Sequence, residues 1–132
     1  MAKIVIYWTG TGNTESIANK IAEDLGVEAK NVADITASEA AAYDLVILGC
    51  PAMGSEELED GEFRPFYDEF KSAKADAKVA LFGSYDWGEG EWLRLWKDEA
   101  DAAGQTVLAT LAVNGDISVA DADEYAAFIA AL

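Results

Sequence analysis

The feature that most restricts the fold of this 132-residue chain is an alternation of short apolar runs with amphipathic segments. Four runs are apolar almost throughout, which predicts strands buried on both faces, as in a parallel sheet. They extend from Ile4 to Trp8, Leu45 to Cys50, Val79 to Gly83 and Val107 to Val113. A weaker run from Val27 to Val32 predicts an edge strand.

The segments between these runs have the periodicity of helices. From Asn13 to Leu25, isoleucine and leucine recur at four-residue intervals, and from Glu91 to Ala103 two tryptophans and two alanines lie on one stripe. Such a stripe opposite charged residues is typical of an amphipathic helix. Further helices are predicted at Ser38 to Ala42, Phe63 to Ser72 and Asp121 to Leu132.

Strands that alternate with helices predict one α/β domain over residues 1–132, with an open five-stranded parallel sheet and helices on both faces. Two strand orders suit such a chain: 2-1-3-4-5, or a truncated dinucleotide-binding order. In both, ligands bind beyond the carboxyl ends of the strands, at the switch point of the topology. The loops after Trp8, Cys50 and Gly83 are therefore the candidate site.

Composition excludes several classes of function. The chain has no histidine, which excludes Ser-His-Asp and Cys-His enzymes, and its single cysteine, Cys50, permits no intramolecular disulfide. The apolar stretch that begins at Ile4 is too short to cross a bilayer, so a cytoplasmic protein is expected. No metal site is predicted, because the acidic clusters lack the spacing of a calcium-binding loop.

Charge points to protein partners. Acidic residues outnumber basic ones 25 to 9, for a net charge of −16. Nucleic acid and anionic membrane surfaces are disfavoured as partners, since both require clustered Lys and Arg. Long-range attraction of a basic protein is one interpretation of the charge, and a solvated surface that aids solubility is the other.

The first candidate loop reads TGTGNT, residues 9–14, between a strand and a helix. Glycines let the backbone curl so that its N–H groups point inward, and the helix N-terminus adds a partial positive charge. The loop therefore predicts a phosphate site without a basic side chain. It is neither a Walker A loop nor GxGxxG. The alternative is a glycine-rich turn in which Asn13 or Thr14 is the helix N-cap.

The other two loops each carry one large, polarizable side chain among small residues. These are Met53 in the loop from Cys50 to Glu56 and Trp87 in the loop from Gly83 to Gly90. Because both loops are predicted at the same sheet edge as the phosphate loop, the two side chains could sandwich a planar aromatic ring. Acids crowd both loops, where they could repel charge on such a ring or attract a basic partner.

These motifs resemble those of a known family. TGTGNT resembles the phosphate loop of the flavodoxins, and GCPAMGSEELED and LFGSYDWGEGEW resemble the two flavin loops of the short-chain bacterial type. The resemblance runs from the first strand to the fourth helix, and only the strand and helix pattern continues it after Gly104. No insertion divides Val107 to Val113, so the long-chain subgroup is not indicated. The resemblance implies FMN as cofactor and the strand order 2-1-3-4-5.

The resemblance also implies roles for individual residues. Side chains of the first loop would hold the phosphate, Met53 and Trp87 would flank the isoalloxazine ring, the peptide between Gly54 and Ser55 would face flavin N5, and Glu56 would bind N3. Backbone N–H groups of residues 86–88 would reach N1 and O2, and Ser84 would lie near the ribityl chain or phosphate. The cofactor-binding residues are Thr9, Gly10, Thr11, Gly12, Asn13, Thr14, Pro51, Ala52, Met53, Gly54, Ser55, Glu56, Gly83, Ser84, Tyr85, Asp86, Trp87 and Gly88.

Three positions depart from the family pattern. Thr9 stands where serine is frequent and keeps the hydroxyl, Pro51 supplies no side-chain hydroxyl, and Asp86 stands where glycine is frequent and adds a charge beside the flavin. These departures bear on the reduction potentials of the flavin more than on the identity of the cofactor.

The function that the resemblance implies is a low-potential one-electron carrier with non-covalently bound FMN, cycling mainly between semiquinone and hydroquinone. Expected partners of this monomer are redox enzymes with basic docking surfaces, of the flavodoxin/ferredoxin reductase, hydrogenase or 2-oxoacid oxidoreductase type. The alternatives are an FMN-dependent quinone or nitro reductase and a flavin-free phosphate-binding or signalling domain. No catalytic residue is predicted for a carrier.

Overall fold

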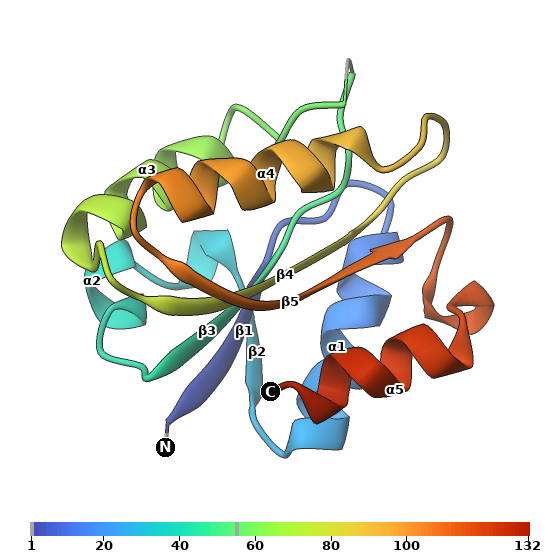
Figure 1. Ribbon diagram of the computed structural model, residues 1–132, viewed down its shortest axis with the longest axis horizontal. Helices are drawn as coiled ribbons and strands as arrows, with labels where there is room; N and C mark the ends of the chain where they lie inside the picture. The colour runs from blue at the N-terminus through green and yellow to red at the C-terminus, as the bar shows by residue number, and fades with distance from the viewer. Residues whose placement is uncertain (1, 55) are drawn as a thin grey trace.

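The computed structural model describes residues 2–54 and 56–132 as a three-layer α/β fold (Figure 1). A parallel five-stranded sheet has the order β2-β1-β3-β4-β5, as the resemblance implied. Its strands are β1 (Lys3–Tyr7), β2 (Glu28–Asn31), β3 (Leu45–Gly49), β4 (Lys78–Ser84) and β5 (Thr106–Val113). The edge position predicted for β2 is confirmed.

Helices cover both faces of the sheet (Figure 1). They are α1 (Asn13–Leu25), α2 (Ala37–Ala40), α3 (Phe63–Ala73), α4 (Glu91–Ala102) and α5 (Ala122–Ala130). On one face lie α1 and α5, and on the other lie α2, α3 and α4. The predicted boundaries agree with these to within two residues, and those of α1 agree at both ends. Two single-turn 3₁₀ helices, at 32–34 and 117–119, were not predicted.

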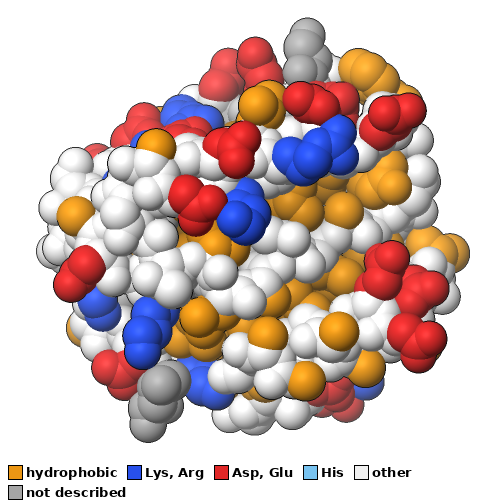
Figure 2. Space-filling view, viewed as in Figure 1, with side chains coloured by type: hydrophobic (Ala, Val, Ile, Leu, Met, Phe, Trp, Pro, Cys, Tyr) orange, Lys and Arg blue, Asp and Glu red, His pale blue; other side chains and the backbone are white. Residues whose placement is uncertain are grey.

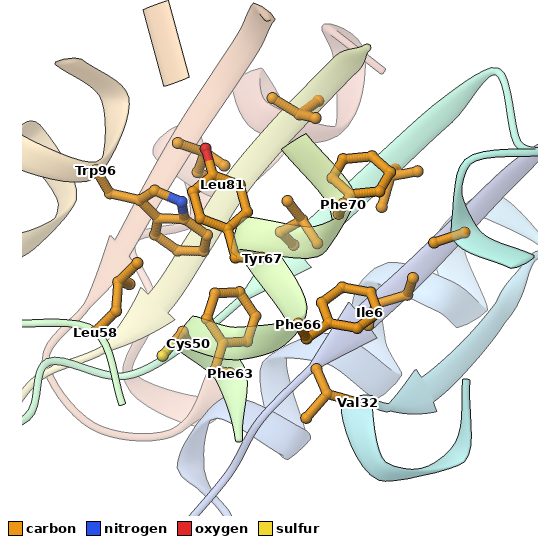
Figure 3. Close-up of a cluster of buried hydrophobic side chains, with 14 of the residues drawn as sticks. Ile6, Val32, Cys50, Leu58, Phe63, Phe66, Tyr67, Phe70, Leu81 and Trp96 are labelled. Atoms are coloured by element: carbon orange, nitrogen blue, oxygen red, sulfur yellow. The ribbon is translucent and has the colours of Figure 1, made fainter. Parts of the chain in front are cut away.

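The larger hydrophobic core lies between the sheet and α3 and α4 (Figure 3). The ring of Phe63 meets the indole of Trp96 edge to face, with centroids 5.3 Å apart, and Tyr67 does so at 5.9 Å. Aromatic pairs of this geometry add about 0.5–1.5 kcal/mol to the effect of burial alone. Through Phe63, its first residue, α3 is thus packed in the core where the loop from β3 ends.

The prediction that Val107–Val113 is covered on both faces holds for only part of the strand. β5 is an edge strand, and residues along its first half alternate between exposed and partly buried. The side chain of Leu108 is 38% exposed. Figure 2 shows hydrophobic side chains in the band between α4 and α5, where β5 lies. An apolar run therefore identified the strand but not its position in the sheet.

The register aligns the carboxyl ends of the three central strands. Tyr7 of β1 lies opposite Gly49 of β3, which lies opposite Phe82 of β4. The three candidate loops consequently leave the sheet at the same edge. Over the described residues, no helix is both long enough and apolar enough to cross a membrane.

Candidate cofactor-binding site

The three loops enclose a cleft of about 120 Å³ at the carboxyl ends of β1, β3 and β4. Residues from all three predicted loops line it, which agrees with the rule for open parallel sheets. The lining residues are Trp8, Thr9, Gly10, Thr11, Asn13, Thr14, Pro51, Ala52, Met53, Ser84, Tyr85 and Asp86. Of the predicted site residues that the structure describes, Gly12, Gly54, Glu56, Gly83, Trp87 and Gly88 do not line the cleft. Ser55 lies outside the described residues.

The phosphate loop leaves the N-terminus of α1 open to a ligand. Gly12 is the N-cap, with φ 96°, and no side chain within the described residues caps the helix. The alternative prediction of Asn13 or Thr14 as N-cap is therefore wrong. Thr9 Oγ1 accepts a hydrogen bond from Gly12 N–H at 3.0 Å, so the proton of the Thr9 hydroxyl remains a donor. First-turn N–H groups without a side-chain cap form a favourable anion site.

Two buried hydroxyls join the phosphate loop to the loop after β4. Thr14 Oγ1 and Ser84 Oγ are 3.0 Å apart, and both residues are at least 95% buried and line the cleft. Their mutual hydrogen bond uses one of the two hydroxyl protons. The second proton is a donor for an acceptor in the cleft, such as a phosphate oxygen.

The tip of the loop after β3 is a closed turn. Met53 N–H donates to the Glu57 carbonyl at 2.8 Å, and Glu57 N–H donates to the Met53 carbonyl at 2.9 Å. Gly54 has φ 49° and Glu56 has φ 58°. The left-handed region costs a non-glycine residue about 1–2 kcal/mol, so surrounding contacts must hold Glu56 in place.

The large side chains at the two loop tips are accessible. Met53 is 39% exposed and lines the cleft, whereas Trp87 is 64% exposed and does not. The structure thus brings Met53, but not Trp87, to the cleft. The proposed sandwich of a planar ring between them stays a prediction.

Two contacts that the sequence analysis missed hold the loop after β3 against its surroundings. The indole N–H of Trp8, itself a cleft residue, donates to Glu62 Oε1 at 3.2 Å. The carboxylate of Glu59 accepts from the backbone N–H groups of Gly61, Glu62 and Phe63 at 2.6–2.8 Å. Only the position of Trp8, at the predicted end of a strand next to the phosphate loop, could have indicated its role.

The pKa of Glu59 reflects this environment. Burial acts to raise it, but the three N–H donors outweigh burial and hold the pKa below its usual range. Beneath the same loop, burial raises the pKa of the Cys50 thiol to about 12. Cys50 therefore stays protonated at neutral pH, in agreement with its prediction as a small buried residue rather than a nucleophile.

The cleft suits a phosphate ester with an aromatic group. Among the described lining residues none is basic, and Asp86 alone carries a charge. The hydrogen-bond donors for a phosphate therefore come from hydroxyl groups and from the N-terminus of α1. Trp8, Met53 and Tyr85 add apolar and aromatic surface for a ring.

A family model described as Flavodoxin matches residues 5–128. The chain belongs to the flavodoxin family. The flavodoxin of Megasphaera elsdenii is 45% identical over 115 residues, which cover 83% of this chain and 84% of that protein. The flavodoxin of Clostridium beijerinckii is 43% identical over 111 residues, 80% of each chain. The solution structure of two-electron reduced Megasphaera elsdenii flavodoxin matches with a TM-score of 0.87 at 40% identity, over 98% of each chain.

Family membership confirms what the loop motifs predicted. The cofactor is FMN, and the protein transfers electrons to redox partners and is not an enzyme. The alternatives of a quinone or nitro reductase and of a flavin-free domain are therefore set aside.

Proposed function

We propose that this flavodoxin is a low-potential one-electron carrier that cycles mainly between the semiquinone and hydroquinone states of FMN. The observation that carries the proposal is the cleft where three loops meet at the carboxyl ends of the central strands, with an uncapped helix N-terminus and one charged residue, Asp86. The carboxylate of Asp86 repels the negative charge that the second electron adds to the flavin, and no described lining residue is a cation that offsets this repulsion. That effect lowers the potential of the second couple.

The proposed orientation of FMN follows the donors of the cleft. The phosphate lies at residues 9–14, where the hydroxyls of Thr9 and Thr11, the Asn13 amide and the Thr14–Ser84 pair bind it. The ring lies between Met53 and Trp87, whose exposed side chains have surface to offer it. The 54–55 peptide faces N5, Glu56 faces N3, and backbone N–H groups of residues 86–88 face N1 and O2.

The proposed partners are redox enzymes with basic docking surfaces, which the net charge of −16 favours. Flavodoxin or ferredoxin reductases, hydrogenases and 2-oxoacid oxidoreductases meet that description. The protein would meet them as a monomer in the cytoplasm. Each encounter would place the exposed rim of the cleft, with Met53 and Trp87, against the partner.

A ligand series tests the site and a redox titration tests the function. FMN, riboflavin and FAD are titrated into the cofactor-free protein while flavin fluorescence is measured. FMN is expected to bind with strong quenching, riboflavin at least tenfold more weakly because it lacks the phosphate, and FAD poorly because the phosphate loop leaves no space for an adenylate. Riboflavin binding as tightly as FMN would contradict the phosphate placement. An anaerobic titration without a semiquinone spectrum would contradict the proposed cycle.

A further inference from the structure

One acidic side chain spans the two loops on either side of the flavin cleft. The backbone of Glu56 belongs to the turn after β3, whereas its carboxylate Oε1 accepts from the backbone N–H of Glu91 at 3.0 Å. Glu91 begins α4, and its N-cap, Gly90, has no side chain to satisfy that end of the helix. Glu56 therefore supplies, from 35 residues away, the acceptor and the negative charge that a helix N-terminus favours.

The carboxylate of Glu56 also packs closely against the tip of the loop after β4. A Cβ on Gly88 would lie 2.7 Å from the carboxyl carbon of Glu56, a separation that real side chains do not adopt. Glycine at position 88 thus leaves the space that the carboxylate fills. Contact and hydrogen bond together place Glu56 between the two loops.

The bases of the same two loops are joined by other bonds. Ala52 N–H donates to the Ser84 carbonyl at 3.0 Å, and the indole N–H of Trp92 donates to the Cys50 carbonyl at 3.1 Å. The bond from Glu91 instead reaches Glu56 in the turn between Met53 and Glu57, where the same carboxylate lies against Gly88. The two loops are therefore joined both where they leave the sheet and at the turn that contains Glu56.

We propose that Glu56 is a strap that sets the separation of the two flavin loops before the cofactor enters. The Glu91 N–H positions the Glu56 carboxylate, and this bond holds the turn in its left-handed conformation and the loop tips at the spacing that FMN requires. Glu91 acts through its backbone alone, because its side chain pairs with Arg94 at 2.8 Å. The proposal rests on the cleft being the FMN site.

Hydrogen exchange of the Glu91 amide in the cofactor-free protein tests the strap directly, by NMR. Glu56→Ala removes the acceptor and is expected to speed exchange of that amide about tenfold or more. The matched control is Glu57→Ala, which removes an exposed carboxylate from the same turn and is expected to leave the rate unchanged. Equal rates in the wild type and Glu56→Ala would overturn the proposal, whatever the protein binds.

Removal of the donor tests whether the strap affects FMN affinity. Glu91→Pro deletes the N–H at the first helical position, where proline fits, and Glu91→Ala removes the same side chain but keeps the N–H. The dissociation constant of FMN should rise about tenfold in Glu91→Pro and stay unchanged in Glu91→Ala. Adding Glu91→Pro to Glu56→Ala should cost nothing further, because the two variants remove one bond.

Additive losses in that double variant would overturn the role in binding. Far-UV circular dichroism checks that each variant folds, and if Glu91→Pro does not, the amide exchange of Glu56→Ala decides. A wild-type protein that does not bind FMN would contradict the proposed site, and the exchange experiment would still decide whether the strap exists.

Discussion

Replacing Glu59 by glutamine removes the charge that holds the loop after β3 to the N-terminus of α3. One carboxylate oxygen accepts from Glu62 and Phe63, and the other accepts from Gly61, all within 2.8 Å. Glutamine keeps the shape of the side chain but offers one carbonyl oxygen and places an NH₂ group against a donor. At best it retains two neutral hydrogen bonds in place of three charged ones.

The expected loss of stability follows from these bonds. Each of the two retained bonds loses about 1 kcal/mol with the charge, and loss of the charged bond to Gly61 adds about 2 kcal/mol, so the free energy of unfolding should fall by about 4 kcal/mol. Unfolding entropy is about 2.1 cal/mol/K per residue near 60 °C, or about 0.28 kcal/mol/K for 132 residues. The melting temperature of Glu59→Gln should therefore fall by about 14 °C.

The contribution of Glu59 to the free energy of unfolding should decrease as pH falls. Because the folded pKa of Glu59 is depressed, its contribution is complete above the unfolded pKa of about 4.3 and is lost as pH falls through the lower folded value. Thermal melts of cofactor-free protein at pH 7 and at lower pH measure both effects. The control, Glu57→Gln, removes the same charge from an exposed position and should shift the melting temperature by no more than about 2 °C.

Equal melting temperatures for Glu59→Gln and Glu57→Gln at pH 7 would refute the assignment of Glu59 as the anchor of the loop. A difference that does not shrink below about pH 4 would refute the electrostatic part of the reasoning. Loss of the anchor should also weaken FMN binding, since the same loop carries Met53 to the cleft.

Three further predictions concern the flavin itself. Asp86→Asn should raise the potential of the second couple by about 20–35 mV and leave the potential of the first couple unchanged. The magnitude is the effect of one charge about 10 Å away at an effective dielectric constant of about 40–80. Asp76→Asn is the control, and equal second-couple potentials in the wild type and Asp86→Asn would contradict the prediction. Thr14→Val removes one hydroxyl of the buried pair with Ser84 and should weaken FMN binding about tenfold without affecting riboflavin, whereas Thr14→Ser should bind normally. Gly54→Thr should lower the maximum semiquinone yield in a reductive titration while FMN remains bound, because Gly54 lies at φ 49°, where threonine is disfavoured; an unchanged yield would show that the turn plays no part.

The fold was predictable because its signals are local. Apolar runs and helical periodicity identified every strand and every α-helix, and the loop motifs supplied the strand order. The exposure of β5 was not predictable, since an apolar run such as Val107–Val113 does not show how far helices extend over each face of the strand. The capping prediction at α1 failed because Gly12, rather than a polar side chain, ends the phosphate loop.

The site was predictable to the level of loops and not of side chains. All three loops reach the cleft, yet sequence spacing did not indicate that Trp87 does not line it or that Trp8 does. The roles of Glu56 and Glu59 were hidden for a related reason. Each carboxylate meets backbone N–H groups whose positions depend on the folded loops, so both residues appear in the sequence as members of an acidic surface.

The uncharged phosphate loop has a consequence for how the protein takes up its cofactor. FMN is an anion, and it must approach a protein of net charge −16 whose described cleft residues include no cation to attract it. Dissolved ions screen this long-range repulsion, with a Debye length of about 10 Å at 0.1 M, but act little on short hydrogen bonds to the bound phosphate. Added salt should therefore speed FMN association and tighten its binding, the reverse of its effect on phosphate sites built from lysine and arginine.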